Sequence, residues 1–147
     1  MPYITQTIDI DLMKKILLAS YDLKGKYFSF WFYHKIDTNI LENVLKSLNP
    51  YFVTKKYLDP ITEHKNSPPK SKTNVYILNK ESIRELERLF PKLQKYMDSI
   101  SVYNTFYDLL AYMIFHEDIA IIKDLSNVHE ILKKHTIEFS DIAPKGW

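Results

Sequence analysis

The densest cluster of reactive side chains is His116, Glu117 and Asp118, which follow a long apolar segment. A histidine beside carboxylates can act as a general base or contribute a metal ligand. Adjacent residues on a helix point about 100° apart, however, and no second histidine lies three or four positions from His116, as helical zinc sites require. We therefore interpret these residues as the polar end of a helix, and we expect no metal site and no cofactor.

The residues that common catalytic motifs need are missing elsewhere. Two glycines, Gly25 and Gly146, cannot form a phosphate-binding loop, a dinucleotide fingerprint or a nucleophile elbow. The absence of cysteine excludes thiol catalysis, thiolate metal sites and disulfides, and it favours a reducing compartment. No export signal or membrane-spanning segment is visible. The sequence thus favours a cytoplasmic protein without enzymatic activity and without a membrane partner.

An aromatic segment, KYFSFWFYHK at 26–35, raises the question of nucleic-acid binding. Aromatic rings on a sheet, next to basic residues, often stack on single-stranded RNA. A strand that is buried on both faces also needs apolar residues at nearly every position. We favour a central, buried strand, with base stacking on Trp31 as the alternative.

Lysines provide the second part of that alternative. Residues 59–73 are rich in proline and lysine and predict a long basic loop between two strands. The candidate nucleic-acid contacts are Lys55, Lys56, Lys65, Lys70 and Lys72, together with Trp31. Nucleic-acid-binding domains are usually more basic than this chain, whose isoelectric point is about 8.6 and whose arginines are only Arg84 and Arg88. A solvated loop is therefore the preferred interpretation.

Acidic and aromatic residues alternate in the second half of the chain. Between Asp98 and Glu130 there are six acidic residues and one lysine. We expect residues 101–117 to form a helix with a core stripe at Val102, Phe106, Leu109, Leu110 and Met113. The candidate partner-binding residues are Asp108, Tyr112, Phe115, Glu117 and Asp118. Exposed rings beside carboxylates are typical anchors for a basic protein, unless a second helix covers them.

Hydrophobic periodicity and capping residues predict the order of the elements. We expect helices over 10–22, from Asp37 to 48, from Asn79 to 97 with a kink at Pro91, over 101–117 and after 127. We expect strands within 26–35, 51–58, 74–79 and 119–123, and a further edge strand over 136–140. The fold prediction is one α+β domain over 1–147, a two-layer sandwich with a mostly antiparallel or mixed sheet and about five helices. Its middle part resembles a split β-α-β-β-α unit of the ferredoxin-like kind.

Taken together, these features favour a small non-catalytic module that binds another protein. The most concrete hypothesis is an immunity-type or antitoxin-like inhibitor of a basic partner, such as a toxin or nuclease domain. The alternative is an RNA- or DNA-binding domain that uses the basic loop and the aromatic strand. A cryptic hydrolase is the third hypothesis.

Overall fold

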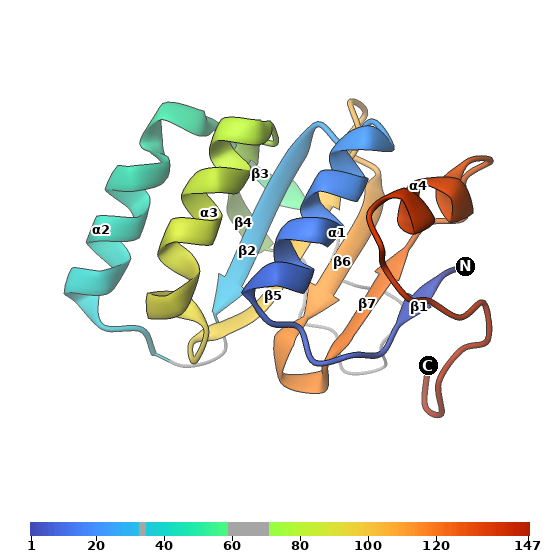
Figure 1. Cartoon of the computed structure of the whole chain (residues 1–147). Helices are drawn as coiled ribbons and strands as arrows, with labels where there is room; N and C mark the ends of the chain where they lie inside the picture. Colours follow the sequence, from blue (N-terminus) through green and yellow to red (C-terminus); the bar gives the residue numbers. More distant parts are fainter. Residues whose placement is uncertain (33–34, 59–70) are drawn as a thin grey trace.

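The computed structural model describes residues 1–32, 35–58 and 71–147, which form one sheet and one layer of helices (Figure 1). The strands are β1 (Tyr3–Ile4), β2 (Tyr27–Phe32), β3 (Phe52–Leu58), β4 (Ser71–Ile77), β5 (Met97–Tyr103), β6 (Leu109–Ile114) and β7 (Ile119–Ile122). The helices are α1 (Ile10–Asp22), α2 (Thr38–Leu48), α3 (Lys80–Leu93) and α4 (Val128–Lys134), with 3-10 turns η1 (Asn49–Tyr51) and η2 (Phe115–Glu117). The predicted α+β class is confirmed, with four α-helices in the described residues instead of about five.

The described strands form a single antiparallel sheet in the order β1-β7-β6-β5-β2-β4-β3. Strand β4 lies between β2 and β3 and so splits the β2-α2-β3 unit, while β5 lies on the other side of β2. This order agrees with the predicted split β-α-β-β-α core. Strands β6, β7 and β1 extend the sheet beyond β5.

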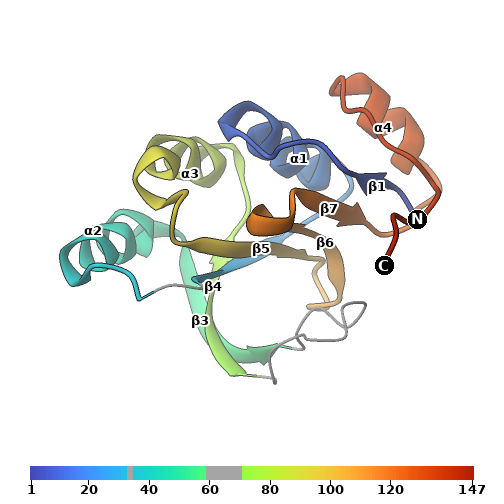
Figure 2. The ribbon, with the colours of Figure 1, turned by 90° about the horizontal axis from the view of Figure 1, so that it is seen from below.

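All four helices lie on one face of the sheet (Figure 2). The strand register brings one row of side chains under them: Phe28 is opposite Val102, Val102 is opposite Ala111, and Ala111 is opposite Ile122. These four side chains are buried in the main core, together with apolar residues of every helix. Burial of this row on the helix-covered face makes it the main hydrophobic layer of the molecule.

The opposite face of the sheet, which we call the helix-free face, is covered by no described helix (Figure 2). Strands β3 and β4 bend away from the helices toward this side. Their Leu58 and Val75 form a small apolar cluster there with Tyr103 of β5. None of the described helices has the length and apolar character needed to cross a bilayer.

Capping residues explain why the predicted helix starts are correct. The Asp9 side chain accepts a hydrogen bond from the Leu12 N–H, and the Asp37 side chain accepts from the first turn of α2. Asn79 and Ser82 form a reciprocal capping box at the start of α3. Such caps satisfy backbone donors that have no partner within the helix.

The helix predicted over 101–117 is wrong, because these residues form the end of β5, a turn and β6. Apolar residues at helical spacing occur there by coincidence. Strand β6 is buried on both faces, with Ala111 and Met113 in the main core and Tyr112 and Ile114 in a second cluster, and β-branched and aromatic residues favour such strands.

Three smaller corrections remain. The helix predicted to residue 97 ends at Leu93, and Met97 begins β5. Residues 71–73 belong to β4, and the predicted strand over 136–140 contributes only an isolated bridge from Ser140 to Tyr3.

Candidate functional site

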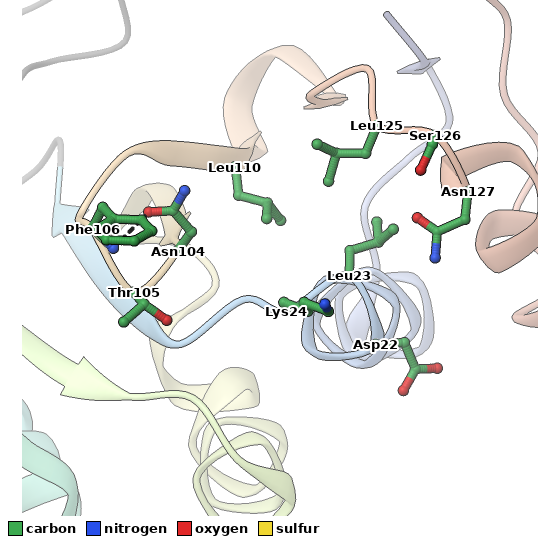
Figure 3. Close-up of a pocket in the computed structure, with 10 residues that line it drawn as sticks. All are labelled: Asp22, Leu23, Lys24, Asn104, Thr105, Phe106, Leu110, Leu125, Ser126 and Asn127. Atoms are coloured by element: carbon green, nitrogen blue, oxygen red, sulfur yellow. Dashed lines mark hydrogen bonds between the residues drawn. The ribbon is translucent and has the colours of Figure 1, made fainter.

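Three segments far apart in the sequence meet at one end of the sheet and enclose a pocket of about 520 Å³. They are the residues at the end of α1, the turn between β5 and β6, and the connection from β7 to α4 (Figure 3). Ten residues line this end pocket: Asp22, Leu23, Lys24, Asn104, Thr105, Phe106, Leu110, Leu125, Ser126 and Asn127.

The floor of the end pocket is apolar. It is formed by Leu23 at the end of α1, Leu110 near the start of β6 and Leu125 in the connection from β7 to α4, which point into the pocket (Figure 3). Leu23 is 4% exposed and Leu110 is 5% exposed, while Leu125 is half-buried. The apolar floor can take up an apolar group of a ligand. The amide, hydroxyl and charged groups of the rim can form hydrogen bonds with the polar groups next to it.

Phe106 stands at the rim and is 80% exposed. Its turn is organised by Asn104, whose Oδ1 accepts hydrogen bonds from the N–H of Phe106 at 2.9 Å and of Asp108 at 3.0 Å. The backbone closes the same turn, because the Asn104 N–H donates to the Asp108 carbonyl at 3.0 Å. An asparagine that bonds its own turn in this way holds the backbone in one conformation. Phe106 is therefore presented to solvent by an ordered turn.

Tyr107, the next residue, is fixed on the helix-free face. Its ring stacks on Tyr27 with a centroid separation of 4.6 Å, and the Lys56 Nζ lies 3.7 Å from its centroid. The backbone of Tyr107 has a φ of 64°, which is uncommon for a bulky residue and costs about 1 kcal/mol or more. The contacts to Tyr27 and Lys56 offset this strain and anchor one side of the turn that carries Phe106.

Lys24 occupies a second strained position beside the pocket. Helix α1 ends in a Schellman arrangement, in which Gly25 N–H donates to Ser20 O at 2.7 Å and Lys24 N–H donates to Tyr21 O at 3.1 Å. The residue at the Lys24 position adopts a φ of 69°, where glycine is usual. Lys24 is exposed, and its side chain lies at the rim of the end pocket (Figure 3).

Asp22 links α1 to α4 behind the pocket. Its Oδ2 lies 2.7 Å from the Nε2 of His135 and 3.2 Å from the Nζ of Lys134. Burial acts to raise the pKa of Asp22, but the hydrogen bonds and charges of His135 and Lys134 outweigh it and hold the pKa below its ordinary value. This connection ties the end of α1 to the C-terminal end of α4, the helix that follows the third pocket segment.

The structure separates the predicted partner-binding residues. Asp108 is exposed in the turn at the end pocket, whereas Phe115 and Glu117 belong to η2 at the other end of β6 and Asp118 follows them. A six-residue strand spans about 20 Å, so the two groups cannot form one small contact surface. Tyr112 is 3% exposed in the middle of β6 and lies next to Trp147, so it is no exposed anchor. The expectation that Asp108, Tyr112 and Phe115 lie on the far side of one helix is wrong, because the segment between them is a strand.

The predicted nucleic-acid residues are also divided. Tyr57 pairs with Lys72 across the β3–β4 ladder, and Lys55 pairs with Asn74, so Lys55, Tyr57 and Lys72 share one face of this hairpin. Lys56 points to the opposite face, over Tyr107. Trp31 is half-buried on β2, and Lys65 and Lys70 lie outside the described residues.

His116 takes part in local pairing. Its Nδ1 lies 3.1 Å from Asp98 Oδ1, and its Nε2 lies 3.6 Å from Glu117 Oε1. The side chain of Asp118 instead accepts a hydrogen bond from the Ile8 N–H at 3.1 Å, which ties the N-terminal segment to the end of η2. Within the described residues, no three His, Asp or Glu side chains are grouped so that they could hold a metal ion.

Phe106 and the leucines of the end pocket were missed by sequence reasoning. Phe106 was assigned to a core stripe, which its exposure contradicts. A signal for the turn was present, since NTFYD at 104–108 separates two apolar runs and carries Asn and Asp at the positions where hairpin turns favour them. The pocket itself depends on contacts between distant segments, which no local pattern reveals.

Comparison of the chain with family models, with curated proteins and with solved structures finds no match.

Proposed function

We propose that this chain is a small non-catalytic module that binds another protein through the end pocket and Phe106. The carrying observation is that Phe106 is 80% exposed and yet held by an internally bonded turn. Large aromatic side chains are enriched among the residues that dominate binding energy at protein interfaces. Order in the free protein lowers the entropy that binding costs, so a fixed ring is a better anchor than a mobile one.

The end pocket beside Phe106 can form a second contact in the same interface. Phe106 enters the partner, while the leucine floor of the end pocket accepts an apolar side chain from it. Hot spots of two partners tend to pair in this way, with polar groups around them excluding water. The polar rim of the end pocket can exclude water from the contact in this way.

The most concrete form of the proposal is an immunity-type or antitoxin-like inhibitor. Asp108 and Asp124 are exposed and belong to two of the segments that form the pocket. Carboxylates around an aromatic anchor would speed association with a basic partner such as a toxin or nuclease domain. Lys24 and Lys123 are also exposed in segments that form the pocket, so the surface around the end pocket carries charges of both signs.

The test is affinity capture from the native host with three forms of the protein. The Phe106→Ala variant should lose the partner that the parent captures, because removal of a central aromatic anchor costs about 2 kcal/mol or more of binding. The matched control is Ile142→Ala, which truncates another apolar residue that is 81% exposed. Both variants should melt at the same temperature as the parent. Equal capture by the parent and by Phe106→Ala would remove the end pocket as the binding site.

A further inference from the structure

Strand β3 is an edge strand of the sheet that the described residues form. It is the last strand in the order, with β4 on one side and no described strand on the other. It is seven residues long, whereas β1 at the opposite edge has two residues and is bridged to Ser140. In an edge strand, the backbone N–H and C=O of every second residue point away from the sheet. These groups have no partner in the ladder and can pair with another strand.

Apolar side chains are concentrated on this edge. Phe52 is 43% exposed, Val53 is 42% exposed and Tyr57 is 61% exposed. In the part of the chain that the structure describes, these are three of the seven large hydrophobic residues that are most exposed. An edge strand that does not bind anything is usually short or polar, because an apolar edge promotes association.

The charge of the edge restricts what can associate with it. Strands β3 and β4 carry Lys55, Lys56 and Lys72 and no acidic residue. Antiparallel pairing of the full length of β3 with β3 of a second copy would place Lys55 opposite Lys55, which is unfavourable. The same lysines attract a strand with acidic side chains.

We propose that β3 accepts an extended, acidic segment of another protein as an eighth strand of the sheet. Backbone hydrogen bonds along β3 supply the affinity, and the side chains of β3 supply the selection. Lys55 and Tyr57 share one face of the strand, two positions apart. The preferred segment therefore carries an acidic residue and, two positions away, an apolar residue.

This inference goes beyond the function proposed above, since it concerns another surface and a partner of opposite charge. A nucleic acid could use the lysines and stack on Tyr57, but it has no peptide backbone that could continue the ladder of hydrogen bonds along β3. The observations thus favour a peptide strand, and nucleic-acid binding becomes one outcome of the test.

The experiment measures binding of a fluorescein-labelled peptide by fluorescence anisotropy. The peptide has about eight residues, with threonine alternating with glutamate and valine so that both lie on one face of the strand. Three further probes are used: the same peptide with lysine in place of glutamate, the same peptide with N-methylated backbone amides at alternate residues, and a single-stranded oligothymidylate.

The parent should bind the acidic peptide, and it should bind neither the lysine peptide nor the N-methylated peptide. The variant with Lys55→Glu and Lys72→Glu should bind at least about tenfold more weakly, because it reverses both charges beside the edge. The matched control, with Lys80→Glu and Lys123→Glu, makes the same change in net charge at exposed positions outside β3 and β4 and should bind like the parent.

Several outcomes would overturn the proposal. They are absence of binding by the acidic peptide, equal binding of the N-methylated peptide, equal binding of the lysine peptide, and binding of the oligothymidylate in preference to the peptide. Concentration-dependent dimerisation of the parent that competes with the peptide would show that a second copy occupies the edge. If the charge-reversed variant fails to fold, the comparison of the four probes on the parent protein still decides.

Discussion

At the scale of single residues, Asn104 determines whether Phe106 is held in a binding position. Replacing Asn104 by Ala removes the acceptor of two backbone N–H groups, at Phe106 and Asp108. We expect the free energy of unfolding to fall by about 1 to 2 kcal/mol in urea denaturation, since unpaired donors and a lost turn bond are costly. Partner capture should also weaken, although Phe106 itself is unchanged.

The control for this prediction is Asn127→Ala. Asn127 also lines the end pocket, but its side chain makes no capping hydrogen bond at the start of α4. Its replacement should change stability by less than about 0.5 kcal/mol. Equal losses for the two variants would mean that the Asn104 hydrogen bonds do not stabilise the turn.

Backbone strain gives a second residue-scale prediction, at Lys24 and Thr136. Thr136 has a φ of 58° at the end of α4, where Ile137 N–H donates to Leu132 O at 2.9 Å, as in the Schellman arrangement at Lys24. Glycine adopts this conformation without a Cβ clash. Lys24→Gly and Thr136→Gly should each raise the free energy of unfolding by about 0.5 to 1 kcal/mol.

The two glycine variants should differ in binding. Lys24 lines the end pocket and Thr136 does not, so only Lys24→Gly removes a group that a partner can contact. Calorimetric melting measures the stability of both variants, and affinity capture measures their binding. Loss of stability in either variant would show that the side chain contributes more than the strained backbone costs.

At the scale of elements, the pairing of Asp22 with His135 and Lys134 connects α1 to α4. Because the pKa of Asp22 is lower in the folded protein, its contribution to stability is fully present above the ordinary value of 3.8 and is lost as the pH falls through the lower folded value. Asp22→Asn should therefore cost about 1 kcal/mol near neutral pH, and the difference from the parent should shrink below about pH 3.8.

An exposed pair provides the control for this pH dependence. His129 Nε2 lies 3.0 Å from Asp141 Oδ1, with side chains that are 48% and 52% exposed. Exposed pairs contribute little, so Asp141→Asn should have almost no effect at any pH. The prediction fails if denaturation curves of Asp22→Asn and the parent stay equally far apart from about pH 7 to about pH 2.

The sequence predicts an element correctly where the residues that determine it, such as a capping residue or an apolar face, are close together in the chain. Helix α1 was predicted with its observed bounds because Asp9 caps it and its apolar residues follow one face. Residues 101–117 predict a helix because Val102, Leu109 and Met113 fit a helical period. The signal for β5 is the alternation of serine with apolar residues over 99–102. Strand β1 was missed, since two residues have no period and their pairing with β7 is long-range.

The candidate site was less predictable than the fold for the same reason. Asp108 was the only residue of the proposed partner-binding set that the structure places in the turn at the end pocket. The pocket requires the end of α1, the β5–β6 turn and the β7–α4 connection to meet, and this follows from the packing of the whole sheet. Exposure of Phe106 follows from the turn at 104–108. Asn104 and Asp108 are a local signal for this turn, but the neighbouring apolar residues also fit a helical period, which predicts a helix instead.

At the scale of the whole molecule, the sheet has two unequal faces. Every described helix covers the same face, and the aromatic strand β2 runs through the middle of the sheet. Phe28 lies on the covered face, is 0% exposed and packs against Tyr76 with ring centroids 5.4 Å apart. Trp31 lies on the other side of the strand, opposite Ser99, and is half-buried. The aromatic segment is therefore a core element on one side and only partly covered on the other.

This asymmetry predicts different costs for two truncations in the same strand. Phe28→Ala should lower the free energy of unfolding by about 3 to 5 kcal/mol, because it leaves a cavity in the main core. Trp31→Ala should cost clearly less, even though the side chain is larger, because a half-buried ring loses less contact and its site is open to water. Urea denaturation of both variants, with Phe28→Leu as an intermediate truncation, measures the difference. Equal losses at Phe28 and Trp31 would mean that the two faces of β2 contribute equally to stability and that the helix layer is not the main source of it.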